Sequence, residues 1–124
     1  MIDISLHGTL FKFFKHPTLD AFVSVGNDND LSVWDLNTLQ LLYKKEGNEY
    51  AIADALIYED TRLKTLYHII ASVNGSLIVY KGEEIYKKIQ LPSIPVSCCI
   101  HQTLLCIGTT SEKVLLYELA TLNL

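Results

Sequence analysis

The chain has 124 residues, of which 49% are hydrophobic and 19% charged, and its formal net charge is −4. These values suit one globular domain and exclude a disordered tail or a collagen-like chain. No apolar run approaches the ~20 residues of a membrane-spanning helix. The acidic residue Asp3, close to the N-terminus, argues against a signal peptide. The mild acidity argues against a nucleic-acid binder. The three cysteines, an odd number, suit a reducing cytoplasmic or nuclear compartment.

A first unit of short β-strands is predicted over residues 8–46. The isolated run Ile2–Leu6 precedes it and is predicted to be an orphan outer strand within residues 1–7. Inside the unit, runs of β-branched, aromatic and aliphatic residues alternate with turn formers, which is typical of strands. The predicted strands lie in Thr9–Phe14, Ala21–Gly26, Asp28–Trp34 and Leu39–Lys45.

The second unit, residues 47–91, repeats this pattern. Its predicted strands lie in Ile52–Tyr58, Tyr67–Ser72, Asn74–Tyr80 and Ile85–Gln90. The apolar residues from Ile52 to Ile70 fit helical spacing about as well as strand spacing, so a helix remains an alternative there. Strands are favoured because the repeat requires them, with Glu59-Asp60-Thr61-Arg62 as the turn.

The third unit, residues 92–124, contains three such runs, namely Val96–Ile100, Leu104–Gly108 and Ser111–Tyr117. Only residues 120–124 follow Leu119, so this unit is predicted to lack its outer strand.

Three seven-residue windows align without gaps and define the repeat. They are Asp28–Trp34, Asn74–Tyr80 and Ser111–Tyr117, at intervals of 46 and 37 residues. Each window opens with a small turn former, continues as a β-prone run and ends on a large aromatic residue. One four-stranded propeller blade occupies ~40–45 residues, so the intervals favour a propeller.

The strand faces indicate stacked sheets. Leu77–Tyr80 and Val114–Leu119 are apolar on both faces, and we expect each strand to be covered on both sides. The outer strands carry lysines that are expected to be solvated and to guard the sheet edges. These lysines are Lys44, Lys45, Lys87 and Lys88.

The segment Asp28-x-x-Leu-x-Val-Trp34-Asp35 resembles the closing signature of a blade in the WD-repeat (WD40) β-propeller family. Tyr80-Lys81 and Tyr117-Glu118 stand where the family has Trp-Asp, and the family's Gly-His pair is absent. The resemblance implies an all-β partial β-propeller of three four-stranded antiparallel WD40-type blades. It also implies that the hydrogen-bond network of Asp, His, Ser and Trp in a regular blade is incomplete here. The structural repeat positions are Asp28, Trp34, Asp35, Asn74, Tyr80, Ser111 and Tyr117.

The segment Ser76–Glu118 is also similar to blades in the second propeller of the actin-interacting protein 1 family. This similarity implies a cofactor of actin disassembly with actin and cofilin as partners. Ribosome-assembly and trafficking propellers have equally degenerate blades, so a subunit of such a complex is a further alternative.

Three units are fewer than the ~4–8 blades of a closed propeller. We therefore expect a fragment of a larger propeller that associates with itself through open blade faces. In the alternative, partners complete the ring in trans, for example two copies that exchange Ile2–Leu6.

The cysteines are the most site-like cluster. Cys98 and Cys99 are adjacent on a predicted strand and point to opposite faces, so they cannot share one zinc ion. With Cys106 they are expected to be structural, and His101 is the nearby base that a catalytic thiol would use.

The remaining motifs are expected to be structural, and we expect no metal or cofactor. Asp28-Asn29-Asp30 resembles the start of a calcium loop but lacks its glycine and its twelfth-position glutamate. Asn74-Gly75-Ser76 matches the glycosylation pattern but is typical of a hairpin turn. The four histidines have no metal spacing, and His68 is expected to be a hydrogen-bonded packing residue. They are His7, His16, His68 and His101.

By resemblance to WD propellers, one rim of loops is expected to bind a protein partner. We call it the partner rim; its residues are Asn29, Asp30, Glu46, Asn48, Glu49, Tyr50, Ser76, Ser93, Ile94, Glu112 and Lys113. Tyr50 is the expected hot spot, because aromatic side chains supply large contact areas at low entropic cost.

The sequence therefore favours a non-enzymatic protein-interaction scaffold, without direct contact to nucleic acid or membrane. A thiol-dependent enzyme that uses Cys98, Cys99 or Cys106 is the remote alternative. A small all-β barrel with a ligand cavity is a third possibility.

Overall fold

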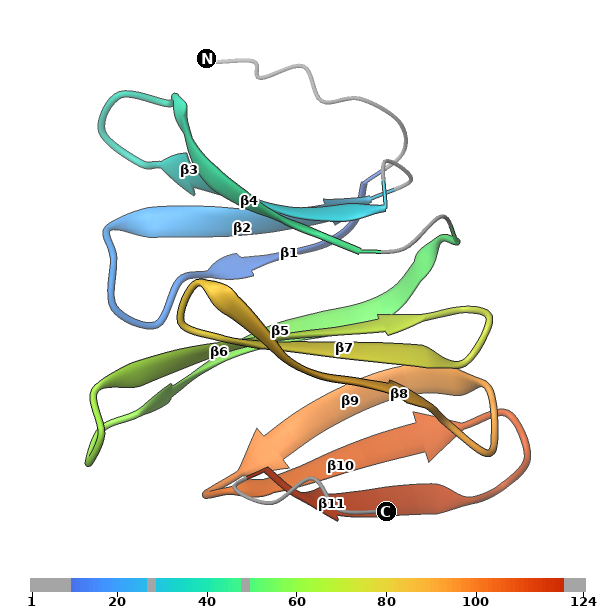
Figure 1. Cartoon of the computed structure of the whole chain (residues 1–124). Helices are drawn as coiled ribbons and strands as arrows, with labels where there is room; N and C mark the ends of the chain where they lie inside the picture. Colours follow the sequence, from blue (N-terminus) through green and yellow to red (C-terminus); the bar gives the residue numbers. More distant parts are fainter. Residues whose placement is uncertain (1–9, 27–28, 48–49, 120–124) are drawn as a thin grey trace.

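The structure, a computed structural model, describes residues 10–26, 29–47 and 50–119. These residues form three separate antiparallel sheets and contain no helix, and Figure 1 shows the sheets stacked as three layers. No helix in this part of the chain is therefore long and apolar enough to cross a membrane. The separate sheets rule out the barrel.

Each sheet is a meander of strands that follow one another in the sequence. Sheet 1 consists of β1 (Leu10–Lys15), β2 (Ala21–Gly26), β3 (Asp30–Asp35) and β4 (Leu41–Glu46). Sheet 2 consists of β5 (Ile52–Asp60), β6 (Thr65–Ser72), β7 (Ser76–Lys81) and β8 (Glu84–Gln90). Sheet 3 contains β9 (Pro95–His101), β10 (Leu104–Thr109) and β11 (Val114–Glu118). These spans lie inside the predicted units 8–46, 47–91 and 92–124. The predicted strand Ile2–Leu6 and residues 120–124 lie outside the described residues.

The segment from Ile52 to Ile70 forms strands, as the repeat requires. Between β5 and β6 the chain turns over residues 61–64. The Asp60 carboxylate accepts hydrogen bonds from the backbone N–H of Arg62 (3.1 Å) and Leu63 (3.4 Å), which is a typical Asx turn. The helical alternative is wrong because these exposed turn residues interrupt the apolar pattern at the point where the chain reverses.

Irregularities in the pairing recur at corresponding places. A β-bulge separates Val33 from Trp34 in the β3–β4 pair, and another separates Val79 from Tyr80 in the β7–β8 pair. A bulge re-aims the side chain beside it and increases the local twist. The repeat seen in the sequence is thus also a repeat of backbone geometry.

Two apolar cores hold the layers together. Val23 and Val33 of sheet 1 pack against Ile70 of sheet 2, and all three are fully buried. On the other face of sheet 2, Ile69 and Val79 pack with sheet 3. Each such aliphatic side chain contributes roughly 1.5–3 kcal/mol on burial. The central sheet is therefore covered on both faces, as predicted for Leu77–Tyr80.

The prediction of coverage on both sides is wrong for Val114–Leu119. Val114 is 68% exposed and Leu116 is 60% exposed, whereas Tyr117 on the other face is 9% exposed. The described residues place sheet 2 on one face of sheet 3 and no further sheet on the other. The apolar residues on that other face consequently meet solvent.

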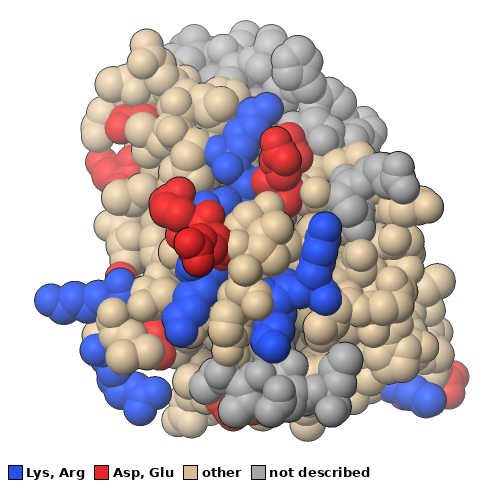
Figure 2. Space-filling model, viewed as in Figure 1, with Lys and Arg blue, Asp and Glu red and all other residues tan. Residues whose placement is uncertain are grey.

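The prediction that the outer-strand lysines are solvated is correct for two of the four. Lys44 and Lys88 are exposed and Lys87 is half-buried, but Lys45 is only 7% exposed. Figure 2 shows lysines and acidic residues interspersed over the edge that contains β4 and β8. The burial of Lys45 has a specific cause, which is described below.

Asp54 of β5 joins the innermost strands of all three sheets. Its Oδ1 accepts a hydrogen bond from the Lys12 ammonium of β1 at 2.7 Å. Its Oδ2 accepts one from the backbone N–H of Cys98 in β9 at 2.8 Å. Because the Asp54 side chain is 11% exposed, this bridge is shielded from solvent and fixes the inner strands relative to one another.

Candidate functional site

The connections that form the partner rim lie at one end of the stack. Figure 1 shows the β6–β7 and β10–β11 turns and the β8–β9 connection at its right-hand end, where β2 and β4 also end. Backbone hydrogen bonds link the turn of each four-stranded sheet to the exit of its last strand. They run from Gly47 N to Asn29 O (3.1 Å) and from Leu91 N to Gly75 O (2.8 Å). Each of these turns is therefore fixed to the connection that leaves its sheet.

Further hydrogen bonds anchor the turns of sheets 2 and 3 on their other side. Val73 N donates to Ala51 O at 2.9 Å, and Thr110 N donates to Ile94 O at 3.0 Å. The Ser111 hydroxyl donates to Ser93 Oγ at 2.8 Å. The β6–β7 and β10–β11 turns are thus tied to the connections that enter their sheets.

The predicted rim side chains differ in exposure. Tyr50 is 46% and Ile94 49% exposed, and Glu112 and Lys113 are also exposed. The half-buried members are Asn29, Asp30, Ser76 and Ser93, while Glu46 is exposed. Asn48 and Glu49 lie outside the described residues. Because nothing in the geometry identifies a ligand, the partner-binding role of these residues stays a prediction.

The aromatic residues that end the three windows occupy equivalent positions in their sheets. Trp34, Tyr80 and Tyr117 each lie on the third strand, opposite Phe22, His68 and Leu105 respectively. Tyr80 packs against the core shared with sheet 1, and Tyr117 packs in the core shared with sheet 2. Tyr80 and Tyr117 therefore help to anchor neighbouring sheets to one another.

The hydrogen bond between the Trp and the Ser of a regular WD blade is present in sheet 1. The Trp34 indole N–H donates to the Ser24 hydroxyl at 2.9 Å. Its ring stacks on Phe22, with centroids 6.2 Å apart and planes at 13°. Asp28, the repeat aspartate of this blade, lies outside the described residues.

The other structural repeat positions stabilise turns. The Asp35 carboxylate accepts hydrogen bonds from the backbone N–H of Asn37 (2.7 Å) and Thr38 (2.9 Å). The bonds from Thr38 and Asn37 lower the pKa of Asp35. Asn74 Oδ1 accepts a bond from the Ser76 N–H at 3.1 Å, and Gly75 takes the positive φ of 93° that this turn requires.

The three cysteines lie on β9 and β10, and Cys99 is paired directly opposite Cys106. Cys98 packs against the core between sheets 2 and 3, whereas Cys99 is exposed. Burial, with a smaller effect from the Asp54 charge, raises the pKa of Cys98 to about 12. Desolvation, followed by the influence of Cys99, also raises the pKa of Cys106. The described residues contain no group of three or more His, Cys, Asp or Glu placed to hold a metal ion.

A buried chain of aromatic hydrogen bonds crosses from sheet 1 to sheet 2 at the end opposite the partner rim. The Tyr43 hydroxyl lies 2.9 Å from His16 Nε2 and 2.7 Å from His68 Nε2. His16 is 1% exposed and His68 is 3% exposed. His68 is therefore the hydrogen-bonded packing residue that the sequence predicted, whereas the roles of His16 and Tyr43 were not predicted.

Burial sets the protonation of this chain of hydrogen bonds. Desolvation first, and then the charges of Lys45 and His16, lower the pKa of His68 to about 4. Desolvation, with a contribution from Lys15, also lowers the pKa of His16. Desolvation and then the Glu83 charge raise the pKa of Tyr43 to about 12. Both imidazoles are therefore neutral and the phenol is protonated at neutral pH.

Lys45 is buried beside this chain of hydrogen bonds because its ammonium lies over two aromatic rings. The Nζ atom is 5.1 Å from the ring centroid of Tyr80 and 5.8 Å from that of Tyr43. It donates to Gly82 O at 3.3 Å and lies 3.7 Å from a Glu83 carboxylate oxygen. A lysine in an outer strand suggested a solvated edge, and only the stacking of sheets 1 and 2 reveals this site.

Grooves between the sheets open at this end of the stack, and two of them are lined by described residues alone. One, of about 260 Å³, lies between sheets 1 and 2 and is lined by Tyr43, Lys45, His68 and Glu83 among others. The other, of about 210 Å³, lies between sheets 2 and 3 and is lined by Asp60, Tyr67, Lys81 and Leu119 among others. The first contains the buried cation and is the stronger candidate for a binding site.

No protein-family model and no curated protein matches this sequence. Among solved structures, the chain is similar to the WD40 β-propeller domain of Doa1, with a TM-score of 0.72 and 16% sequence identity. That match covers 90% of this chain and 37% of the other, so the chain spans well under half the length of the protein it resembles. With three stacked antiparallel sheets and this structural neighbour, the chain has the all-β fold of a partial WD40-type β-propeller.

Proposed function

We propose that the chain is a non-enzymatic protein-interaction scaffold that presents the partner rim on a rigid stack of sheets. The observation that carries this proposal is the set of backbone hydrogen bonds that joins successive rim connections. Loops fixed in this way can present Tyr50 and Ile94, which are both about half exposed, at little entropic cost on binding.

The fold and the thiol chemistry support a role without bond-making. Propellers present loops from stacked blades, and the raised pKa of Cys98 disfavours a reactive thiolate. The three free cysteines suit the reducing cytoplasm or nucleus, where we expect this scaffold to act. Titration of the native thiols tests the enzyme alternative, because one rapidly alkylated cysteine of low pKa would contradict the proposal.

The main test measures the affinity for a partner after substitution in the rim. A partner captured with the chain as bait would be identified and purified, and its dissociation constant measured for the native chain, Tyr50→Ala and Ile94→Ala. We expect at least a tenfold weaker affinity for Tyr50→Ala, because hot-spot truncations cost about 2 kcal/mol or more.

Leu63→Ala is the matched control, since Leu63 is 62% exposed in the β5–β6 turn at the other end of the stack. Equal affinities for all three variants and the native chain would overturn the assignment of the rim. Co-sedimentation with cofilin-decorated actin filaments distinguishes the actin-disassembly alternative, which requires the chain in the filament pellet.

A further inference from the structure

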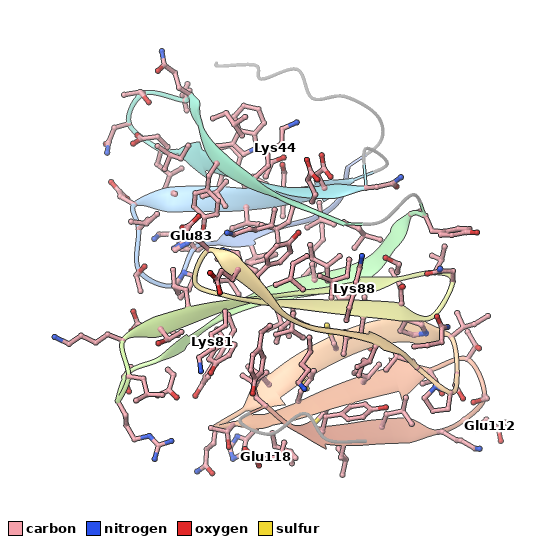
Figure 3. All side chains as sticks on the ribbon, in the orientation of Figure 1. Lys44, Lys81, Glu83, Lys88, Glu112 and Glu118 are labelled. Carbon is pink, nitrogen blue, oxygen red and sulfur yellow. The ribbon has the colours of Figure 1, made fainter. Side chains whose placement is uncertain are left out.

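The groove between sheets 1 and 2 is the strongest unassigned feature of the molecule. Its volume of about 260 Å³ is below the ~300–1,000 Å³ of pockets that hold drug-sized ligands, so it suits a single side chain. Leu19 and Leu66 supply apolar walls, and Lys45 and His68 supply the polar groups. In Figure 3, Glu83 lies at the β7–β8 turn, next to sheet 1.

The hydrogen bonds around His16 determine which atoms of the His16–Tyr43–His68 hydrogen-bond network carry protons. His16 Nδ1 accepts bonds from the backbone N–H of Thr18 (3.2 Å) and Leu19 (3.0 Å). A neutral His16 therefore carries its proton on Nε2 and donates it to the Tyr43 oxygen. The Tyr43 hydroxyl must then donate to His68 Nε2.

It follows that the proton of neutral His68 is on Nδ1. This atom is buried and has no hydrogen-bond partner among the described residues. A buried donor without an acceptor costs about 1–3 kcal/mol. His68, which lines the groove, thus holds a buried N–H donor that lacks an acceptor.

Lys45 adds a positive charge that its neighbours neutralise only weakly. The Glu83 side chain is 99% exposed and 3.7 Å away, and such solvated ion pairs contribute little. Gly82 O is a neutral acceptor at 3.3 Å. The aromatic rings hold the ammonium in place but do not cancel its charge.

From this geometry we propose that the groove binds the carboxylate of a glutamate side chain from a protein partner. The Lys45 ammonium donates to a carboxylate oxygen beside the His68 ring, and Leu19 and Leu66 pack against the methylene groups. Glu83 acts as an internal competitor that the ligand displaces. The inference rests on the proposed function as an interaction scaffold, but it uses the end of the stack opposite the partner rim.

The experiment titrates the full chain, labelled with ¹⁵N, with the peptide Ac-Ala-Glu-Ala-NH₂. Its Gln counterpart and sodium acetate are titrated in parallel. We expect the Glu peptide to produce a saturable change in the His68 imidazole Nδ1 resonance. The Gln peptide should produce none, and acetate should bind at least threefold more weakly. A Gln peptide that binds as tightly as the Glu peptide would show that no charge is required. Acetate that binds as tightly as the Glu peptide would show that any carboxylate suffices, and would overturn the assignment to a glutamate side chain.

Substitutions test the roles of the two charged residues. Glu83→Gln, at a solvated position, should raise the affinity for the Glu peptide at least twofold. Lys45→Met should lower that affinity at least tenfold, and Lys45→Arg should largely retain it, which separates loss of charge from loss of fold. Lys88→Met, at an exposed position of β8, is the control without effect.

Unchanged affinity in both Glu83→Gln and Lys45→Met would overturn the assigned contacts. If the peptide produces no change while the Tyr50→Ala variant still loses its partner, only the carboxylate site fails. If the peptide binds and the rim variants behave as the native chain, the rim fails and the carboxylate site remains.

Discussion

Tyr43 shows how a single hydroxyl can control two imidazoles. It donates to one ring and accepts from the other, so the tautomers of His16 and His68 are coupled. The direction of the chain of hydrogen bonds is determined by two backbone N–H groups near the surface, at Thr18 and Leu19. A local turn thereby defines the state of a buried histidine in the next sheet.

His68 makes stability depend on pH. Its pKa is about 4 in the folded chain and about 6.5 when unfolded, so between these values the unfolded chain binds more protons. The contribution of His68 to the free energy of unfolding should be complete above pH 6.5 and should decrease as the pH drops toward 4. We expect a loss of about 2–3 kcal/mol from this group between pH 7 and pH 4.5, measured by urea denaturation.

Two variants identify the source of this pH dependence. His68→Phe should lose most of the slope, whereas His101→Gln, at an exposed position, should keep it. An unchanged slope in His68→Phe would contradict the assignment.

At the scale of elements, the turns that end each hairpin are controlled by a few residues. At Gly75, φ is 93°, and a Cβ atom would lie 2.5 Å from Gln90 Nε2. That nitrogen donates to Asn74 O at 3.0 Å. An added methyl group would thus strain the backbone and also displace a hydrogen bond.

Gly75→Ala should lower the free energy of unfolding by about 1.5–2.5 kcal/mol, the sum of both effects. Gly82→Ala is the matched control, because its φ of 63° carries the same kind of strain but no atom lies within 4 Å of the new Cβ. Its loss should be only about 1 kcal/mol. Chemical denaturation measures both, and equal losses would show that the Gln90 contact is unimportant.

The sequence predicts the elements that depend on interactions between residues close together in the chain. It does not predict the features that depend on contacts between distant residues. The strand Ala21–Gly26 was predicted with its observed bounds, because its apolar run and the turn formers beside it are local signals. The exposure of Val114 and Leu116 was not predicted, since apolar composition does not show whether a neighbouring sheet is present. The groove was missed for the same reason: Tyr43 and His68 are 25 positions apart and meet only when the sheets stack.

At the scale of the whole molecule, the inner strands are joined by one carboxylate. Asp54→Asn would remove the negative charge that binds the Lys12 ammonium. The new amide could accept the Cys98 N–H only through its oxygen, because its NH₂ group is a donor. We expect a loss of about 1–3 kcal/mol in the free energy of unfolding. In contrast, Asp20→Asn, which alters an exposed hydrogen bond to Asn37, should change it by less than about 0.5 kcal/mol. Thermal and urea denaturation compare the two variants, and similar effects would contradict a bridging role for Asp54.

The open face of sheet 3 predicts association with a second copy of the chain. Leu31 and Leu77, which correspond to Val114 in the pairing, are fully buried by the next sheet. A second copy would give Val114 and Leu116 the same cover. Light scattering should show a mass above that of the monomer, and Leu116→Lys should weaken the association at least tenfold, because a charge would have to be buried. Ile85→Lys, at a 52% exposed position of β8, should not weaken it, and a monomeric native chain would contradict the prediction.

The lone tryptophan has a practical consequence. Because Trp34 is the single indole of the chain, and it stacks on Phe22 and donates to Ser24, its fluorescence reports on the first layer alone. Circular dichroism averages over all three layers. Agreement between the two unfolding curves would mean that the three sheets unfold as one cooperative unit. An earlier change in fluorescence emission would mean that sheet 1 unfolds before sheets 2 and 3.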